Sequence, residues 1–141
     1  MSPPCRARVT ALATAAMLLA ACSPDEADPV GKVEAEVEQA LRNAAPQEVF
    51  TGVLAGQAVR LVVRDCEVFR SQSTPAGPTT WERVLAPEPY PFFTRCERQS
   101  MSAEAGGVTA RLGRMALGAG GCCASGGTYH SGDGRHWVKM P

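Results

Sequence analysis

The clearest structural signal in this chain of 141 residues is Val59-Arg60-Leu61-Val62-Val63-Arg64. Valine and leucine at its odd-numbered positions alternate with two arginines and one valine at the even-numbered positions. A two-residue period of this kind is typical of a strand that turns one face to a core and the other to water. The apolar positions change parity after Asp65, since Cys66 and Val68 continue the pattern. We expect a β-bulge near Asp65 to cause this shift.

Similar patterns later in the chain predict a body that is mainly β. We expect further strands or extended segments at residues 47–54, 79–85, 90–99 and 108–117. Trp81, Arg83 and Leu85 would share one side of their strand. Two short segments around Gly132-Asp133-Gly134 predict a terminal hairpin. Residues 47–141 are therefore expected to form a small antiparallel β-sheet or a barrel-like domain.

One helix, over residues 30–46, is expected to precede this β-rich domain. Its apolar residues recur at helical spacing, at Val30, Val33, Val37 and Leu41. Pro46 is expected to end the helix. The apolar stripe is narrow, so the helix should pack only lightly on the body. The expected class is mainly β, of the α+β kind.

The first 22 residues are expected to be a targeting and anchoring segment rather than part of the folded body. Arg6 and Arg8 form a short positive region, and residues 11–21 form an uncharged apolar stretch. This stretch ends in Leu19-Ala20-Ala21-Cys22, which resembles the lipobox of bacterial lipoproteins. The resemblance implies cleavage after Ala21, a diacylglycerol thioether on Cys22, and acylation of the new amine with a chain such as palmitate. Residues 1–21 are then a signal peptide.

The lipobox resemblance also implies a location and a first partner, the lipid bilayer that would hold the acylated Cys22. Ser23 stands where an inner-membrane retention signal usually places Asp, so we expect the periplasmic face of the outer membrane rather than the inner membrane. No uninterrupted apolar run reaches the roughly 20 residues of a membrane-spanning helix.

The charges are balanced over the whole chain, with 14 basic residues, 14 acidic residues and a pI of about 6.7. This balance gives no argument for nucleic-acid binding. The distribution is uneven, because residues 22–50 carry a net charge of −5 and residues 51–141 carry +3. We therefore expect an acidic linker at residues 22–29, with a mildly basic body behind it.

Four cysteines lie in the predicted body, and they are Cys66, Cys96, Cys122 and Cys123. An oxidising periplasm would pair them in two disulfides. A bridge between neighbouring cysteines closes a strained ring. We therefore expect Cys122 and Cys123 each to reach back to Cys66 or Cys96.

A metal site is the alternative for the cysteines near the C-terminus. Cys122 and Cys123 could combine with His130 or His136. Structural zinc sites use cysteine pairs separated by two to four residues, and adjacent cysteines do not fit that spacing. We therefore predict no metal and no cofactor.

A hydrolase built on His130 and His136 is one functional hypothesis, because Ser131 and Asp133 lie beside these histidines. A nucleophile, a base and an orienting acid usually come from separate elements, however, and Ser131 and Asp133 are typical turn residues. The chain also lacks a nucleophile elbow, a P-loop and a dinucleotide-binding fingerprint. We therefore predict that the protein is not an enzyme.

The stretch from Ser131 to Trp137 is similar to the S-x-D-G-x-x-W hairpin of Asp-box repeats. The resemblance implies that Asp133 holds the turn and that Trp137 packs beneath it. The motif is present once, which indicates a single hairpin and not a propeller.

A second resemblance covers the same end of the chain. Ser125, Tyr129, Trp137 and Lys139 follow the order S-G-x-x-Y…W-x-K. This order is similar to that of the membrane-bound inhibitors of c-type lysozyme, which are lipid-anchored, disulfide-linked small β-barrels. The resemblance implies that Ser125 and Lys139 reach into the lysozyme cleft. The alternative is that Tyr129 and Trp137 are cross-strand partners in the core.

These observations leave three functional hypotheses. The first is a non-enzymatic binding or envelope-accessory module with a protein partner in the envelope. The second is an inhibitor or immunity protein against a cell-wall hydrolase such as lysozyme. The third is the hydrolase that would use His130 or His136.

Overall fold

The computed structural model describes residues 29–141 apart from residues 74, 119 and 120. The predicted signal peptide, Cys22 and residues 22–28 of the predicted linker lie outside the described residues. Within the described part, no helix is long and apolar enough to cross a bilayer.

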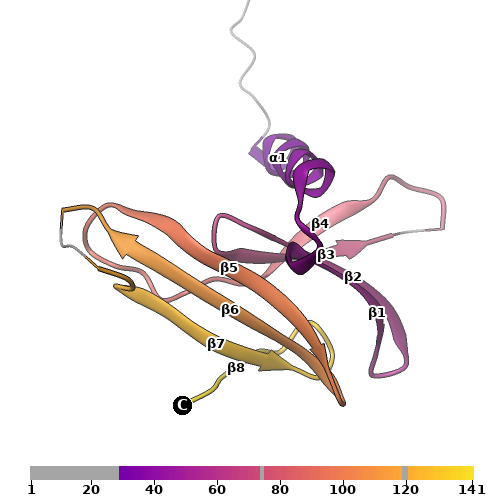
Figure 1. The fold of residues 1–141 in the computed structure, drawn as a ribbon. Helices are drawn as coiled ribbons and strands as arrows, with labels where there is room; N and C mark the ends of the chain where they lie inside the picture. The colour runs from indigo at the N-terminus through magenta and orange to yellow at the C-terminus, as the bar shows by residue number, and fades with distance from the viewer. Residues whose placement is uncertain (1–28, 74, 119–120) are drawn as a thin grey trace, which may run out of the picture.

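The described chain forms one α-helix, one short 3-10 helix and two four-stranded antiparallel sheets (Figure 1). Sheet A has the order β1 (Val49–Leu54), β2 (Gln57–Arg64), β3 (Glu67–Gln72) and β4 (Thr80–Leu85). Sheet B has the order β5 (Thr94–Glu104), β6 (Gly107–Ala116), β7 (Ser125–Ser131) and β8 (Val138–Lys139). The predicted class, mainly β with one N-terminal helix, is confirmed. The barrel-like alternative is wrong, because the ladders of the two sheets share no strand in the described chain.

The two sheets pack face to face around one apolar core. Sheet A contributes Leu54, Val59, Leu61, Val63 and Val68, and sheet B contributes Met101, Val108, Ala110, Leu112 and Tyr129. Leu61 and Val108 are 0% exposed. The alternation at residues 59–64 and 108–113 therefore marks the two inner faces, as a half-buried strand requires.

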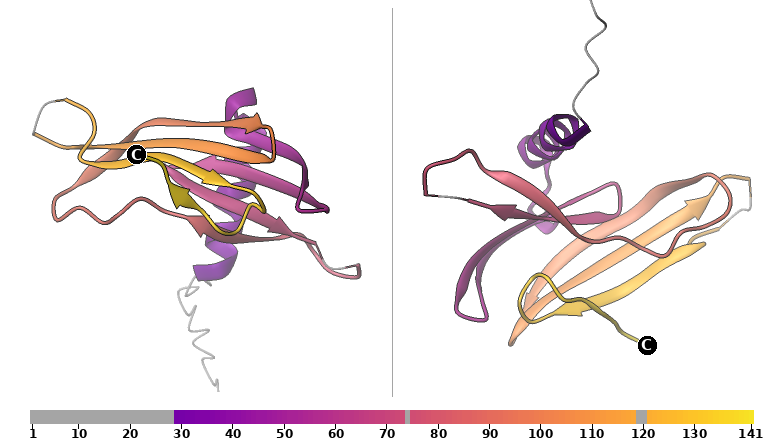
Figure 2. Two further views of the ribbon diagram at one scale, coloured as in Figure 1. Left: turned by 90° about the horizontal axis from the view of Figure 1, so that it is seen from below. Right: turned by 180° about the vertical axis from the view of Figure 1, so that it is seen from behind.

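Helix α1 (Pro29–Asn43) covers the opposite face of sheet A. The two views of Figure 2 show α1 on one side of sheet A and sheet B on the other. Val37 is fully buried against Val62, Phe69 and Trp81. The indole nitrogen of Trp81 donates a hydrogen bond to Glu38 at 2.9 Å. Val62, at an even-numbered position of β2, is therefore buried by the helix rather than exposed to water.

The helix ends at Asn43, earlier than the predicted residue 46. Pro46 begins the 3-10 helix η1 (Pro46–Glu48) instead. The residue before a proline avoids the helical region, and Ala45 is extended, with φ −69° and ψ 155°. The chain thus leaves the helix before Pro46 and enters β1 directly after η1.

The prediction of a β-bulge near Asp65 is wrong, because Asp65 and Cys66 form the turn between β2 and β3. Both residues have positive φ, at 47° and 58°, as a two-residue type I′ hairpin requires. The apolar pattern changes parity there because the chain reverses direction. A register irregularity lies instead between Val68 and Phe69, in the pairing of β3 with β4.

That irregularity also changes the face of sheet A to which the last side chains of β4 point. Trp81 packs under α1, whereas Leu85 packs against the core between the sheets. The prediction that Trp81 and Leu85 share one side is therefore wrong. An irregularity of this kind shifts the following side chains to the other face, since the side-chain period of a strand is two residues.

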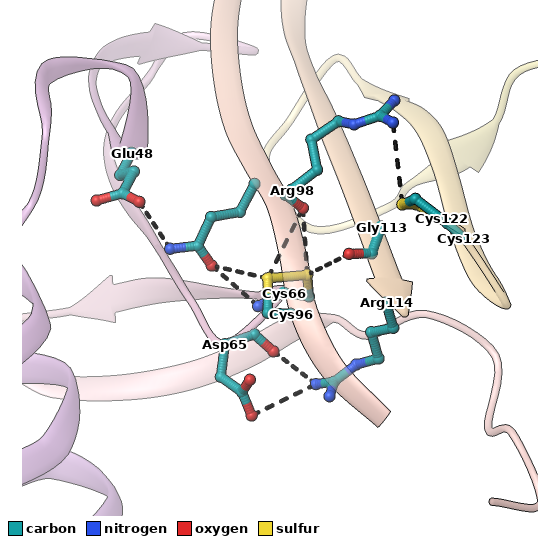
Figure 3. Close-up of a disulfide and its surroundings, with 10 residues drawn as sticks. Glu48, Asp65, Cys66, Cys96, Arg98, Gly113, Arg114, Cys122 and Cys123 are labelled. Carbon is teal, nitrogen blue, oxygen red and sulfur yellow. Dashed lines mark hydrogen bonds and ion pairs between the residues drawn. A yellow bond between two sulfur atoms is a disulfide. The ribbon is translucent and has the colours of Figure 1, made fainter. Parts of the chain in front are cut away.

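The disulfides join different cysteines from those expected. Cys66 is bonded to Cys96 with a sulfur–sulfur distance of 2.06 Å, which links the β2–β3 turn of sheet A to β5 of sheet B (Figure 3). Cys122 is bonded to its neighbour Cys123. The predicted long-range bridges of Cys122 and Cys123 are therefore wrong.

The stacking of the sheets explains the observed pairing. Cys66 is fully buried in the core and contacts the carbonyl oxygens of Arg98 and Gly113. A Cβ atom added to Gly113 would collide with the Cys123 sulfur. Leu112, the neighbour of Gly113, faces the core, so Gly113 and Cys123 lie on the outer face of sheet B. Strand β6 thus separates Cys123 from Cys66.

Candidate functional site

Two of the four predicted partner-binding residues, Ser125 and Lys139, line a polar groove of about 540 Å³ that follows β7. We call it the β7 groove. Its lining includes Ser125 of β7, Lys139 of β8 and Glu88 of the loop between β4 and β5. Arg98 of β5 and Arg111 of β6 complete its charged residues. Four strands and one loop therefore meet at this groove.

The short last strand keeps the groove open. Strand β8 pairs only with Tyr129 and His130 of β7, and Met140 adds one hydrogen bond, from its N–H to the Thr128 carbonyl at 2.8 Å. In the described chain no strand lies on this side of residues 125–127. A strand edge without a pairing strand can accept a partner's backbone.

Two glycines shape the floor of the β7 groove. Gly126 has φ +112°, and a Cβ atom there would collide with the Leu112 carbonyl. Gly127 has φ +147°, and a Cβ atom there would lie 2.8 Å from Cε of Lys139. Both positions require glycine for their backbone conformation, and Gly126 also requires it for space. The Lys139 side chain passes over Gly127 as a result.

Lys139, Glu88 and Tyr129 form a small charged network at one wall. The Lys139 ammonium donates to Glu88 at 2.9 Å, and the Tyr129 hydroxyl donates to the other Glu88 oxygen at 3.3 Å. The Lys139 nitrogen also lies 5.8 Å from the centre of the Tyr129 ring. Together these contacts hold the Lys139 head group against the groove wall.

The network shifts the pKa values of its members in the expected directions. The hydrogen bond from Lys139 lowers the pKa of Glu88, and the hydrogen bond to Glu88 raises the pKa of Lys139. Burial raises the pKa of Tyr129, and the neighbouring Glu88 charge adds to this effect. At neutral pH the network therefore holds one carboxylate, one ammonium and one neutral hydroxyl.

Arg98 and Arg111 make the β7 groove positive. Neither forms an ion pair with an acid in the part of the chain that the structure describes. With Lys139 they supply three positive charges against the single carboxylate of Glu88. The arrangement suits an acidic or carboxylate-bearing surface.

The structure divides the four predicted partner-binding residues into two groups. Ser125 and Lys139 line the groove, and the Ser125 hydroxyl is buried without a hydrogen-bond partner among the described residues. Tyr129 is 5% exposed and its ring belongs to the core, so only its hydroxyl takes part in the network. Trp137 packs against the same core.

Sequence reasoning did not single out Glu88 as a site residue, nor the roles of Arg98 and Arg111 beside Lys139. Glu88 lies 51 residues before Lys139 and follows Pro87 in a proline-rich loop. No local pattern connects these positions. Only the packing of the loop onto β7 and β8 brings them together.

The histidines do not form a catalytic triad with their neighbours. Asp133 stands between the two other groups, because it accepts hydrogen bonds from the Ser131 hydroxyl at 3.1 Å and contacts Nδ1 of His136 at 2.6 Å. A triad requires the histidine in the middle, between nucleophile and carboxylate. His130 contacts the Thr109 hydroxyl at 3.3 Å. Within residues that the structure describes, no three His, Cys, Asp or Glu side chains could hold a metal ion.

Asp133 holds the turn before β8, as the Asp-box resemblance implies. One of its oxygens accepts the backbone N–H groups of Arg135 and His136, both at 2.8 Å. The Ser131 hydroxyl accepts the backbone N–H of Gly134 at 2.8 Å. These bonds replace backbone partners that the turn would otherwise lack.

The substitution Asp133→Ala is expected to lower the free energy of unfolding by about 1 to 2 kcal/mol at pH 7, because two backbone bonds to a charged acceptor are lost. The pKa of Asp133 is held well below its ordinary value, first by the His136 side chain and then by the backbone N–H groups. A depressed pKa contributes stability above the unfolded value near pH 4 and loses it as the pH falls further. Urea unfolding at pH 7 and pH 2.5 measures both effects.

A matched control for Asp133→Ala is Glu104→Ala, since Glu104 is exposed. This control should change stability by less than about 0.5 kcal/mol. A difference between wild type and Asp133→Ala that stays constant from pH 7 to pH 2.5 would contradict the role assigned to the carboxylate.

Comparison with known proteins gives no family or function for the β7 groove. No protein-family model matches the chain, and no curated protein or solved structure matches it either.

Proposed function

We propose that this chain is a lipoprotein of the outer membrane, anchored through Cys22 with its body in the periplasm, and that its β7 groove binds a partner protein without catalysis. The lipobox resemblance supports the anchor. The observation that carries the binding role is the meeting of Lys139, Arg98 and Arg111 at an open strand edge. Charged groups at such an edge select a partner of complementary charge, while the free backbone offers hydrogen bonds.

A second candidate function is inhibition of a cell-wall hydrolase of the c-type lysozyme kind. One specific observation favours it: Ser125 and Lys139, which the inhibitor resemblance pairs, line the same groove. Glycoside hydrolases of this kind carry two carboxyl groups in the cleft. A groove with three positive side chains is complementary to such a cleft.

The double substitution Ser125→Ala, Lys139→Ala tests the inhibitor function. If the groove inhibits a c-type lysozyme, the double variant should inhibit it at least about 100-fold more weakly, because hydrogen bonds to charged groups contribute about 1.5 to 3 kcal/mol each and two are lost. A lysozyme turbidity assay with purified protein measures the effect. Ser102→Ala, Lys32→Ala is the matched control, because both residues are exposed and lie outside the groove.

The outcomes separate the two candidates. Equal inhibition by the two double variants, or none by the wild type, would exclude the inhibitor. The general binding role is then tested by a photo-crosslinking residue at Thr128, inside the groove, in intact envelopes. A single adduct that Arg111→Glu removes supports the role. An adduct that persists in Arg111→Glu, or no adduct at all, argues against it.

A further inference from the structure

A second cavity lies in sheet A, and it shares no lining residue with the β7 groove. Strands β2 and β3 pair only from Leu61–Arg64 to Glu67–Arg70. Beyond Leu61, β2 stays with β1 and β3 stays with β4, and Figure 1 shows these two hairpins diverging. A cavity of about 570 Å³ opens at the divergence. We call it the hairpin wedge.

Three arginines line the hairpin wedge, with polar side chains between them. Arg60 comes from β2, Arg70 from β3, and Arg135 from the turn between β7 and β8. The polar side chains come from Gln57, Ser71, Gln72 and Ser73. Among the described residues, no acid lines the wedge.

Arg70 is the unusual member of this group, because it is 6% exposed. One of its terminal nitrogens donates to the side-chain oxygen of Gln57 at 3.3 Å. Its Nε is buried without any hydrogen-bond partner, and it forms no ion pair with an acid among the described residues. A buried guanidinium cannot lose its proton, so an unpaired one is unfavourable.

The acid opposite Arg70 is engaged elsewhere. Glu82 of β4 is the cross-strand partner of Arg70 in the sheet. Its carboxylate instead accepts hydrogen bonds from Arg135, at 3.0 Å, and from Gln72. Arg60 also has no ion pair among the described residues. The wedge therefore has more positive charge than the nearby acid balances.

We propose that the hairpin wedge binds an oxyanion, a carboxylate or a phosphate group carried by a small molecule, with Arg70 as its main ligand. Guanidinium groups bind both anions through paired N–H donors. The cavity is many times larger than the roughly 30 Å³ of one water molecule, so it has room for a group larger than a free ion. This site is independent of the proposed partner binding at the β7 groove.

Thermal unfolding of the purified full chain tests the proposal, with sodium phosphate or sodium acetate compared with sodium chloride at equal ionic strength. A bound anion should raise the Tm by about 5 to 10 °C at tenfold excess over its Kd. A larger shift in phosphate than in acetate identifies a phosphate site, and the reverse identifies a carboxylate site. No shift beyond that in chloride would overturn the proposal.

The variant Arg70→Met separates binding from a general salt effect. It should lose the anion-dependent shift, and in chloride it should be at least as stable as wild type, because it removes an unpaired buried charge. Arg95→Met, at an exposed arginine of the other sheet that lines neither the hairpin wedge nor the β7 groove, should keep the shift. An Arg70→Met variant that keeps the shift would exclude this site.

A second measurement covers the case in which Arg70→Met does not fold. The Nε–Hε signal of Arg70 in the wild type, followed by NMR during titration with phosphate and with acetate, should move and saturate in the anion that binds. A signal that stays unmoved in both titrations would overturn the proposal without any variant.

Discussion

Replacing both halves of the inter-sheet disulfide, with Cys66→Ala and Cys96→Ala together, is expected to lower the free energy of unfolding by about 3 to 4 kcal/mol. The bond closes a loop of 30 residues, and the chain-entropy model assigns a stabilisation of this size to such a loop. For a body of this size the loss corresponds to a fall in Tm of roughly 15 to 25 °C. Denaturant unfolding of the oxidised proteins measures it.

The position of the bond adds a second reason for a large effect. Cys66 is fully buried, and its backbone N–H donates to the Gln99 side chain at 3.0 Å. Gln99 in turn donates to Glu48 at 2.7 Å (Figure 3). The disulfide therefore links sheet A, sheet B and the end of η1 at one point. Separation of the sheets would break all of these contacts together.

The matched control is the double substitution Cys122→Ala, Cys123→Ala. These cysteines are adjacent and exposed, so their bond restricts the unfolded chain very little. The expected change in the free energy of unfolding is below about 0.5 kcal/mol. Equal losses in the two double variants would show that the inter-sheet bond has no special role.

Cys22→Ser is expected to move the protein almost completely from the membrane fraction to the soluble periplasmic fraction. The serine hydroxyl cannot form the thioether that the lipobox resemblance implies at this position. Each buried CH₂ group contributes about 0.8 kcal/mol, and one acyl chain alone binds only reversibly, so stable anchoring needs several chains. Fractionation and intact-mass measurement check the loss of both the membrane location and the lipid mass.

The chain contains its own control for this experiment. Cys5 lies inside the predicted signal peptide, so Cys5→Ser should leave both the mature mass and the membrane location unchanged. A wild-type protein that is soluble and carries no lipid mass would refute the proposed anchor. The fold and the two candidate sites would remain unaffected, since they lie in the described body.

Strand alternation in the sequence was sufficient to predict some strands but not which side chains are buried. Residues 108–117 were predicted as a strand and form β6 almost without change. Val62 shows the limit of the same reasoning. Its burial comes from α1, which packs on sheet A through Val37, and strand alternation cannot report a helix on the outer face.

The predicted cysteine pairing was wrong for a related reason, since it too depends on contacts between elements far apart in the sequence. Arithmetic on four cysteines leaves three pairings, and ring strain was the only local criterion available to choose among them. The structure chooses by distance across the stacked sheets, because Cys66 faces the core and Cys123 lies on the outer face of sheet B. Sequence separation contains no information about which face of which sheet a residue occupies.

Features with local causes could be predicted from the amino-acid sequence. These are the mainly antiparallel β class, the helix that stops before Pro46, and the turn held by Asp133. Each follows from a periodicity or from the conformational preference of a few neighbouring residues. The same signals placed Ser125 and Lys139 near one hairpin, but they did not indicate which residues of other elements lie beside them.

Which distant residues meet depends on the tertiary structure. It brings Glu88, Arg98 and Arg111 to Lys139. It also leaves Arg70 buried at the point where two hairpins separate, without an ion pair among the described residues. Such meetings depend on how two sheets and a helix stack. Stacking is set by non-directional burial of apolar surface over the whole domain, which no short stretch of sequence specifies.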